Sequence, residues 1–244
     1  GNRLTNVNVA GDGATGDTVL EIADHFQNLT SFDAAGFAGQ LGSQANRLGF
    51  DYTAMLPGGS TFGGAASIAG GDGGNVIGVY LEDGADVDLE LTGGASADDL
   101  LVDRKGENGE GTFGDIAVDA GEGDNAVTVR RLSGENLSIA AGGGDDGITV
   151  ERVDASGSVA IDAGDGDNAI DYANPWWAGR MAVGNGLSIA AGAGFDTVNV
   201  VRVNVEGDLE VSLGDGGSDV TVRRVDADVR DEDSTGGSLS IAVG

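Results

Sequence analysis

The feature that most constrains this chain is an internal repeat. Five clear copies begin at Ile116, Leu137, Val159, Leu187 and Leu209, and looser copies begin at Val7, Ala66 and Leu89. Each copy reads as an alternating apolar run, a glycine-rich turn and a second alternating run. The clear copies start 21, 22, 28 and 22 residues apart (116 to 137, 137 to 159, 159 to 187, 187 to 209). A fixed period with one local insertion indicates a repeat architecture.

Within a copy, apolar residues alternate with polar ones. Leu187 and Ile189 share one side of the first run, and Val198 and Val200 share one side of the second. A period of two predicts β-strands, and strands this short are stable only when copies stack about 4.8 Å apart. A third apolar point follows in several copies, at Leu132, Val153, Val203 and Val225.

This pattern predicts an all-β fold, a right-handed parallel β-helix (β-solenoid) with about eight coils of 21–22 residues that spans 1–244 as one domain. The hand follows from the general preference for right-handed parallel connections. A β-sandwich, the alternative, does not explain why the same turn residues recur at the same offsets. Three segments break the period and are expected to be insertions: an irregular, partly helical one at 23–65, a Trp-containing loop at 173–182 and an acidic loop at 226–237.

Stacked coils turn single positions into columns. One column lies two residues before the apolar residue that opens the second strand, and consists of Asp17, Asn75, Asp98, Asn125, Asp146, Asn168, Asp196 and Ser218. These short polar side chains accept backbone hydrogen bonds and suit tight turns. The flanking glycines allow the positive φ angles that such turns need.

The turns resemble those of a known family. The runs GAGFDTVNV from Gly192 and GGGDDGITV from Gly142 are similar to the RTX nonapeptide GGxGxDxUx, whose stacked turns bind Ca²⁺. The resemblance covers the turns only, and it implies a bacterial surface β-solenoid in which Asp146 and Asp196 are the metal ligands. Asn125 and Asn168 stand where the motif has Asp, and each coil has one such turn rather than two.

Two interpretations of the polar column remain open. In one, Ca²⁺ is a cofactor and its candidate ligands are Asp17, Asp98, Asn125, Asp146, Asn168 and Asp196, because calcium prefers six to eight oxygen ligands. Further turn acids favour it, since stacked carboxylates repel each other and a cation would relieve them. In the other, side-chain amides and carboxylates form a metal-free ladder from coil to coil.

A second column follows the second strand and consists of Arg104, Arg131, Arg152, Arg202 and Arg224. The nearby acids Asp103, Glu151, Asp154, Glu206 and Asp226 favour a charge-paired ladder on the outside of the stack. The alternative is a binding stripe for an acidic glycan, which the overall charge opposes.

Composition excludes several functions. The 244 residues carry a net charge of −29, from 41 acidic and 12 basic side chains, so the surface repels nucleic acid and anionic lipid. There is no Cys, and no apolar stretch is long enough to span a membrane. His25 is the single His, and no acid pair stands out from the many acids, so we expect no enzyme activity. Trp176 and Trp177 are expected either to plug the solenoid side or to bind a sugar or a second subunit.

These observations predict an extracellular or cell-surface structural or adhesive element. The chain starts near one strand (4–10) and ends on another (239–243), so we expect either head-to-tail stacking of subunits or a longer repeat protein. The alternative is a polysaccharide-active β-helix enzyme or a glycan-binding module.

Overall fold

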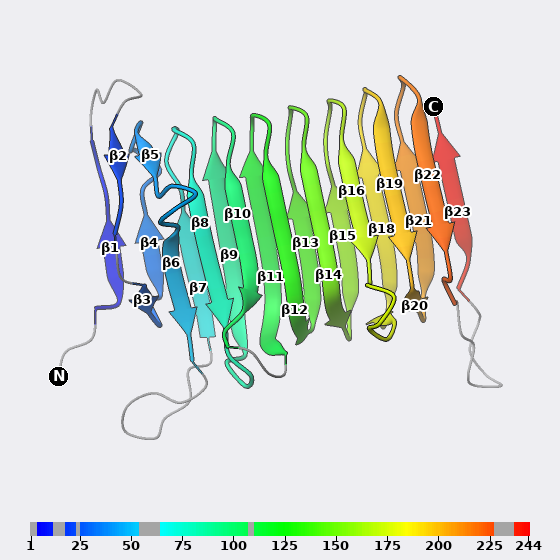
Figure 1. Cartoon of the computed structure of the whole chain (residues 1–244), viewed down its shortest axis with the longest axis horizontal. Coiled ribbons are helices and arrows are strands. Elements are labelled where there is room, and N and C mark those ends of the chain that lie inside the picture. The colour runs from blue at the N-terminus through cyan, green and yellow to red at the C-terminus, as the bar shows by residue number, and fades with distance from the viewer. Residues whose placement is uncertain (1–3, 12–17, 23–24, 54–63, 107–109, 227–236) are drawn as a thin grey trace.

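The computed structural model describes residues 4–11, 18–22, 25–53, 64–106, 110–226 and 237–244. All regular elements in these ranges are β-strands that pair in parallel, which makes a β-solenoid of about nine coils (Figure 1). No helix occurs in them, and therefore none that could cross a membrane. The all-β solenoid expected from the repeat is confirmed, with about one coil more than expected.

Two long faces run the length of the stack. The first face consists of β1 (Asn6–Asn8), β4 (Ser31–Asp33), β7 (Gly64–Ala69), β9 (Val87–Gly94), β11 (Gly111–Gly121), β13 (Asn136–Ala140), β15 (Ser158–Asp162), β18 (Gly186–Ala191), β21 (Asp208–Leu213) and β23 (Leu239–Val243). The second face consists of β3 (Phe26–Gln27), β6 (Leu48–Tyr52), β8 (Val76–Leu81), β10 (Asp99–Arg104), β12 (Ala126–Gly134), β14 (Gly147–Ala155), β16 (Ala169–Ala173), β19 (Asp196–Val201) and β22 (Ser218–Arg223).

Short strands complete the coils. β2 (Val19–Leu20) pairs with β5 (Gln40–Leu41), and β17 (Met181–Val183) pairs with β20 (Val203–Val205). The pair of β17 and β20 belongs to a narrow third side of the solenoid. The first residues of β11 and the last residues of β12 and β14 lie on the same side. Here the predicted apolar points Leu132, Val153 and Val203 are fully buried.

The register is that of the sequence repeat. Leu137 pairs with Val159, and Ile139 with Ile161, so equivalent residues of successive coils lie directly above one another. Their side chains are 1–2% exposed and fill the interior, while the residues between them point outward. Because a single strand is not stable by itself, the stability of the fold depends on this stacking from coil to coil.

The described part of the segment 23–65, residues 25–53 and 64–65, contains strands and no helix, so it is not the partly helical insertion that its aromatic content suggested. Residues 25–53 contain β3 to β6 and form a layer of the stack between β1 and β7. Phe32 and Phe50 lie in the core with ring centroids 5.3 Å apart. Tyr52 is buried and donates to the carbonyl oxygen of Leu29 (2.7 Å). Aromatic side chains thus take interior positions of these coils, as Phe113 and Tyr172 also do further along the stack.

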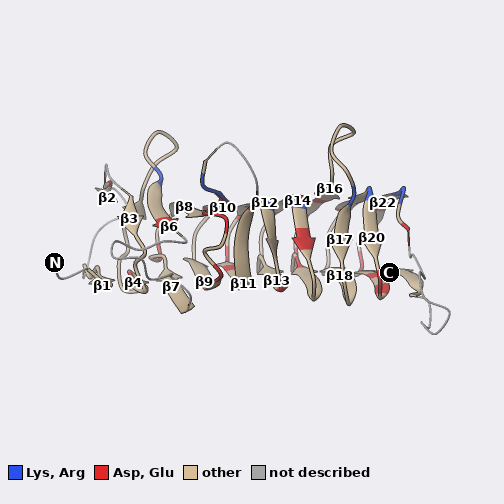
Figure 2. Cartoon of the chain, turned by 90° about the horizontal axis from the view of Figure 1, so that it is seen from below, with Lys and Arg blue, Asp and Glu red and all other residues tan. Residues whose placement is uncertain are grey.

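The Trp-containing break lies mainly between two strands. Residues 174–180 form the loop between β16 and β17, which stands away from the stack in Figure 2. Of the acidic segment 226–237, residues 227–236 lie outside the described residues, as does residue 17 of the polar column.

The glycine turns offer a direct test of the stacking. Gly164 has φ +71°, and a Cβ atom there would overlap the carbonyl oxygen of Gly142 in the coil before. We expect Gly164→Ala to lower the free energy of unfolding by about 3 kcal/mol or more. Gly147→Ala is the matched control, because a Cβ at Gly147 would meet nothing closer than 3.9 Å. Denaturant unfolding measures both, and equal losses would contradict this account.

Candidate functional site: the polar column and its surroundings

The polar column is a continuous buried ladder. Its described members from coil to coil are Asn75, Asp98, Asn125, Asp146, Asn168 and Asp196, none more than 3% exposed, with Ser218 less buried at the end. Each lies at the start of a second-face strand or directly before it, and the register of β8, β10, β12, β14, β16 and β19 aligns them. The column predicted from the sequence therefore exists in space.

Backbone hydrogen bonds connect the ladder from step to step. The Oδ1 of Asp98 accepts the N–H of Asn75 (2.6 Å), and the Oδ1 of Asn125 accepts the N–H of Asp98 (2.9 Å). The same bond continues through Asp146 (2.8 Å), Asn168 (3.0 Å) and Asp196 (3.2 Å). Each side chain thus satisfies a buried donor of the preceding coil, which would otherwise destabilise the fold.

Asparagine and aspartate alternate strictly along this ladder. The amide nitrogen of Asn125 donates to the carbonyl oxygens of Gly121 (3.2 Å) and Gly123 (2.7 Å) in its own turn. That of Asn168 does the same with Gly164 (3.2 Å) and Gly166 (3.0 Å). Because an amide separates every two carboxylates, no two buried charges occupy neighbouring coils. The alternation thus keeps the buried carboxylates from repelling one another at one-coil spacing.

The aspartates differ in how many of their carboxylate oxygens accept hydrogen bonds. Both oxygens of Asp98 accept hydrogen bonds, Oδ1 from Asn75 and Oδ2 from the N–H of Gly94 (2.8 Å). The Oδ2 atoms of Asp146 and Asp196 are buried and have no hydrogen-bond partner in the described part of the chain. Asp146 holds the register position of Asn125 one coil further on, but a carboxylate cannot donate to glycine carbonyls as the amide does.

Burial also raises carboxyl pKa values in the ladder. It raises the pKa of Asp98 to about 6, against the opposing effect of hydrogen bonds from Asn75 and Gly94. It raises the pKa of Asp146 to about 6 as well, against hydrogen bonds from Asn125 and with help from the charges of Asp124 and Asp145. The unpartnered Oδ2 of Asp146 is therefore suited to take up either a proton or a cation.

Only part of the predicted calcium set fits a metal. The amide nitrogens of Asn125 and Asn168 donate to the glycine carbonyl oxygens that an ion would otherwise contact. Both carboxylate oxygens of Asp98 already accept hydrogen bonds. Asp146 and Asp196 remain, each with one unpartnered oxygen beside a glycine turn. The described residues hold no group of three or more Asp, Glu, His or Cys side chains placed for a metal, so backbone carbonyls would have to supply most ligands.

A second, exposed ladder of acids runs beside the buried one. Asp124 accepts the N–H of Asp145 (2.9 Å), Asp145 that of Asp167 (2.9 Å), and Asp167 that of Phe195 (2.7 Å). These carboxylates occupy successive coils with no amide between them. Each is stabilised by a backbone donor, and water screens the repulsion that remains.

The arginine column lies at the corner after the second face and has an unusual backbone. Four members adopt the left-handed conformation: Arg131 (φ 60°), Arg152 (55°), Arg202 (64°) and Arg224 (54°). This conformation costs a residue with a Cβ roughly 1–2 kcal/mol. The expected charge pairing occurs at Arg131, which binds the buried Asp103 together with Arg130. Asp226 instead pairs with Arg180 of the Trp loop.

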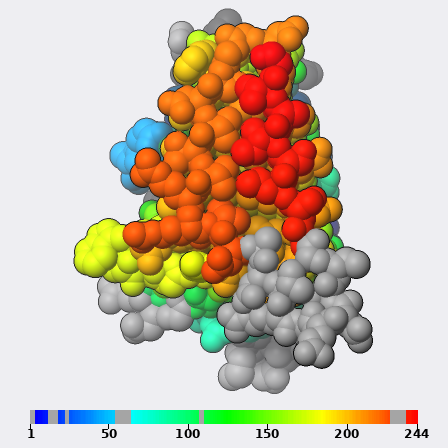
Figure 3. Space-filling model, turned by 90° about the vertical axis from the view of Figure 1, so that its right-hand side faces the viewer, coloured from blue at the N-terminus to red at the C-terminus, as the bar shows by residue number. Residues whose placement is uncertain are grey.

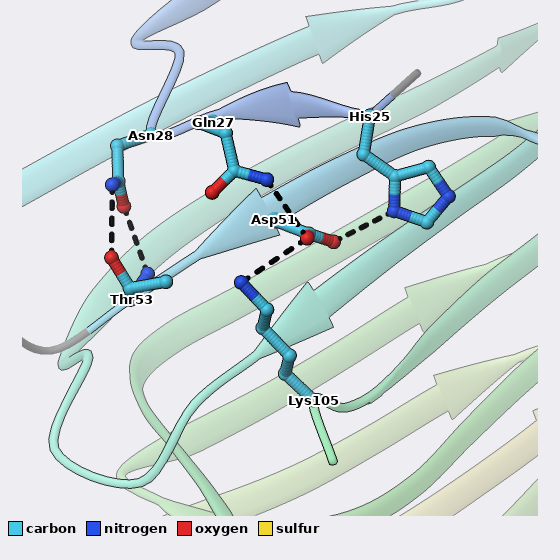
Figure 4. A network of polar contacts seen from close by, with 6 residues as sticks. All are labelled: His25, Gln27, Asn28, Asp51, Thr53 and Lys105. Atoms are coloured by element: carbon cyan, nitrogen blue, oxygen red, sulfur yellow. Dashed lines mark hydrogen bonds and ion pairs between the residues drawn. The ribbon is translucent and has the colours of Figure 1, made fainter. Parts of the chain in front are cut away.

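A polar cluster near the N-terminal end was not foreseen from the sequence. The single His and the single Lys both contact Asp51, which is 8% exposed (Figure 4). His25 Nδ1 lies 2.8 Å from Oδ1, while Lys105 Nζ (3.2 Å) and Gln27 Nε2 (3.0 Å) contact Oδ2. The cluster connects β3, β6 and the end of β10, so we interpret it as a set of polar contacts that stabilises the packing of these coils. No spacing in the sequence pairs these residues.

The two tryptophans do not plug the solenoid side. Trp176 is 82% exposed and Trp177 is 62% exposed, so the interpretation as a buried plug is wrong. Polar contacts of Asn174 and Arg180, and not burial of the indoles, hold the loop that carries them in place. The contact function of these residues remains as a prediction.

Comparison with protein-family models, with curated proteins and with solved structures finds no match for this chain.

The ladder predicts an unusual dependence of stability on pH. Asp98 and Asp146 have folded pKa values of about 6, above the 3.8 of an unperturbed Asp. The stability that protonation contributes is complete below pH 3.8 and is lost as the pH rises through 6. With chelator present, we expect the melting temperature to rise between pH 7 and pH 4, by roughly 2–4 °C for each kcal/mol gained. Calorimetric melting measures it, and a flat or falling profile would contradict it.

Proposed function

We propose that this chain is an extracellular structural or adhesive β-solenoid, a building element of a fibre or cell surface that assembles head to tail. The observation that carries the proposal is the exposure of apolar core positions on β23, the last described strand of the first face. The repeat and the strongly acidic composition are the sequence features that support the proposal. The glycine and aspartate turns support a relationship to bacterial β-solenoid surface proteins with RTX-like turns.

The C-terminal end presents core positions to solvent. Leu239, Ile241 and Val243 stack in register on the buried Leu209, Val211 and Leu213, yet they are 59%, 43% and 54% exposed. Figure 3 looks onto this end, where β23 (red) and β22 (orange) form the surface. Full burial of each side chain is worth roughly 1.5–3 kcal/mol, so a further coil on this end would be strongly favoured.

The N-terminal end offers a surface of the same kind. Among the described strands β1 pairs only with β4, and Leu4 beside it is 60% exposed. β1 and β23 both belong to the first face and lie at opposite ends of the stack (Figure 1). The two edges can therefore meet strand to strand in parallel. The second face ends one strand earlier, at β22, so the first face would carry the join.

The proposal includes calcium at Asp146 and Asp196, whose unpartnered oxygens are the two suitable ligands in the ladder. Bound calcium would hold adjacent glycine turns together and offset part of the net negative charge. Asp98, Asn125 and Asn168 would then belong to the metal-free steps of the same ladder. We propose no enzymatic role for the chain.

Self-assembly is tested by one charge at the open end. Ile241→Glu places a carboxylate on the apolar surface of β23 and should abolish association, while Ala242→Glu, on the outward side of the same strand, should leave it intact. Light scattering over a range of concentrations measures the mass. The unmodified chain should exceed 24.2 kDa as concentration rises. A constant mass of 24.2 kDa would contradict the assembly.

Calcium is tested by a substitution that copies the neighbouring coils. Asp146→Asn supplies the amide group that Asn125 and Asn168 already use, so it should stabilise the chain in chelator by about 1 kcal/mol. It should also reduce the rise in melting temperature that calcium produces in the unmodified chain. Asp145→Asn, at an exposed position of the same turn, is the control. If calcium leaves the melting temperature of the unmodified chain unchanged, the metal part of the proposal fails.

A further inference from the structure

The Trp loop is an ordered projection with exposed aromatic side chains. The amide nitrogen of Asn174 donates to the carbonyl oxygen of Gly179 (3.0 Å), which closes the loop at its base. The N–H of Ala178 donates to the carbonyl oxygen of Pro175 (3.0 Å) and forms a turn within it. Trp176 and Trp177 lie inside this turn. A loop held by such contacts presents its side chains in one arrangement rather than many.

Contacts to the solenoid fix the loop further. The guanidinium carbon of Arg152 lies 5.5 Å from the ring centroid of Trp177, a cation–π contact. Arg180 donates to Asn204 Oδ1 (3.0 Å) and pairs with Asp226. These contacts hold Trp177 in place although most of its surface is exposed. Little conformational entropy is left for a ligand to remove on binding.

A surface pocket of about 250 Å³ opens beside Trp177. Its lining includes Glu110, Arg152, Asp154, Asn174, Trp177 and Arg180. Asn174 is 8% exposed, and its Oδ1 is buried without a hydrogen-bond partner among the described residues. One wall is therefore an indole, and the others carry planar amide, carboxylate and guanidinium groups. The pocket is small, so it fits one or two sugar rings and not a folded partner.

We propose that this pocket is a binding site for a neutral, pyranose-based glycan. The apolar C–H face of a pyranose ring packs on an exposed indole, as other flat apolar groups do. Its hydroxyl groups both donate and accept hydrogen bonds. They can bind the carboxylates of Glu110 and Asp154 as donors and the guanidinium of Arg152 as acceptors. The site would anchor the solenoid to a polysaccharide.

Charge selects a neutral glycan over an acidic one. Arg152 and Arg180 are matched by Glu110 and Asp154, so the pocket carries no excess of positive charge. The protein as a whole carries −29, which repels a polyanionic chain before it reaches the pocket. Burial and the charge of Asp154 raise the pKa of Glu110, against the opposing effect of Arg152 and Arg104.

The loop carries its own reporter, because Trp176 and Trp177 are the two tryptophans of the chain. The test is a titration with cellopentaose, xylopentaose, mannopentaose and maltopentaose, in which tryptophan fluorescence and calorimetry detect binding. A galacturonate pentamer is the acidic comparison. A saturable change in emission with at least one neutral pentasaccharide is expected. Trp177→Ala should weaken binding by about tenfold or more. Trp176→Ala tests whether the second indole contributes.

Phe195→Ala is the matched control, because Phe195 is 54% exposed but lies in the turn between β18 and β19 and lines no part of the pocket. It should bind like the unmodified chain, and all variants should remain folded because their side chains lie outside the core. The proposal is overturned if no neutral pentasaccharide binds, if only the acidic one binds, or if Trp177→Ala binds normally. It is also overturned if Trp177→Ala changes only the mass in solution, which would make the loop a subunit contact. None of these results depends on assembly at the solenoid ends.

Discussion

Parallel hydrogen bonding from each coil to the next is the interaction on which the rest of this structure depends. No strand is long enough to be stable alone, so each must pair with its counterparts one coil before and one coil after. That requirement fixes the distance between successive coils and places equivalent residues of those coils in columns. The turns must then fit under one another, which is why glycine stands where a Cβ would overlap a carbonyl oxygen of the neighbouring coil, as at Gly164.

Columns of identical residues would be unfavourable in a chain this acidic, and the molecule limits the repulsion in different ways. In the buried ladder, amides separate the carboxylates, so Asp98 and Asp146 have Asn125 between them. In the exposed ladder, each carboxylate accepts a backbone N–H of the next coil. At the arginine corner, the buried Asp103 binds two guanidinium groups. The left-handed backbone of Arg131 is a local cost that these contacts offset.

The features with the strongest functional implications lie where the regular stack stops. At the C-terminal end, Leu239, Ile241 and Val243 occupy core positions without a coil above them among the described residues. At the Trp loop, Asn174 takes the register position of the arginine column, and the chain leaves the stack before β17 returns to it. The regular coils thus provide a rigid body, and the interruptions provide the surfaces that can contact something else.

The sequence by itself determined the repeat, the parallel solenoid and the polar column, because a period of two within strands and a fixed period between coils leave few other ways to bury the apolar residues. It did not determine that Phe32, Phe50 and Tyr52 fill regular coils, since an aromatic core breaks the aliphatic pattern on which the repeat was recognised. Nor could it pair His25 and Lys105 with Asp51, or place Arg152 against Trp177, because these residues meet only after coils of different length have stacked. Which aspartates keep an unpartnered oxygen was also decided by tertiary structure, as it depends on hydrogen bonds from neighbouring coils.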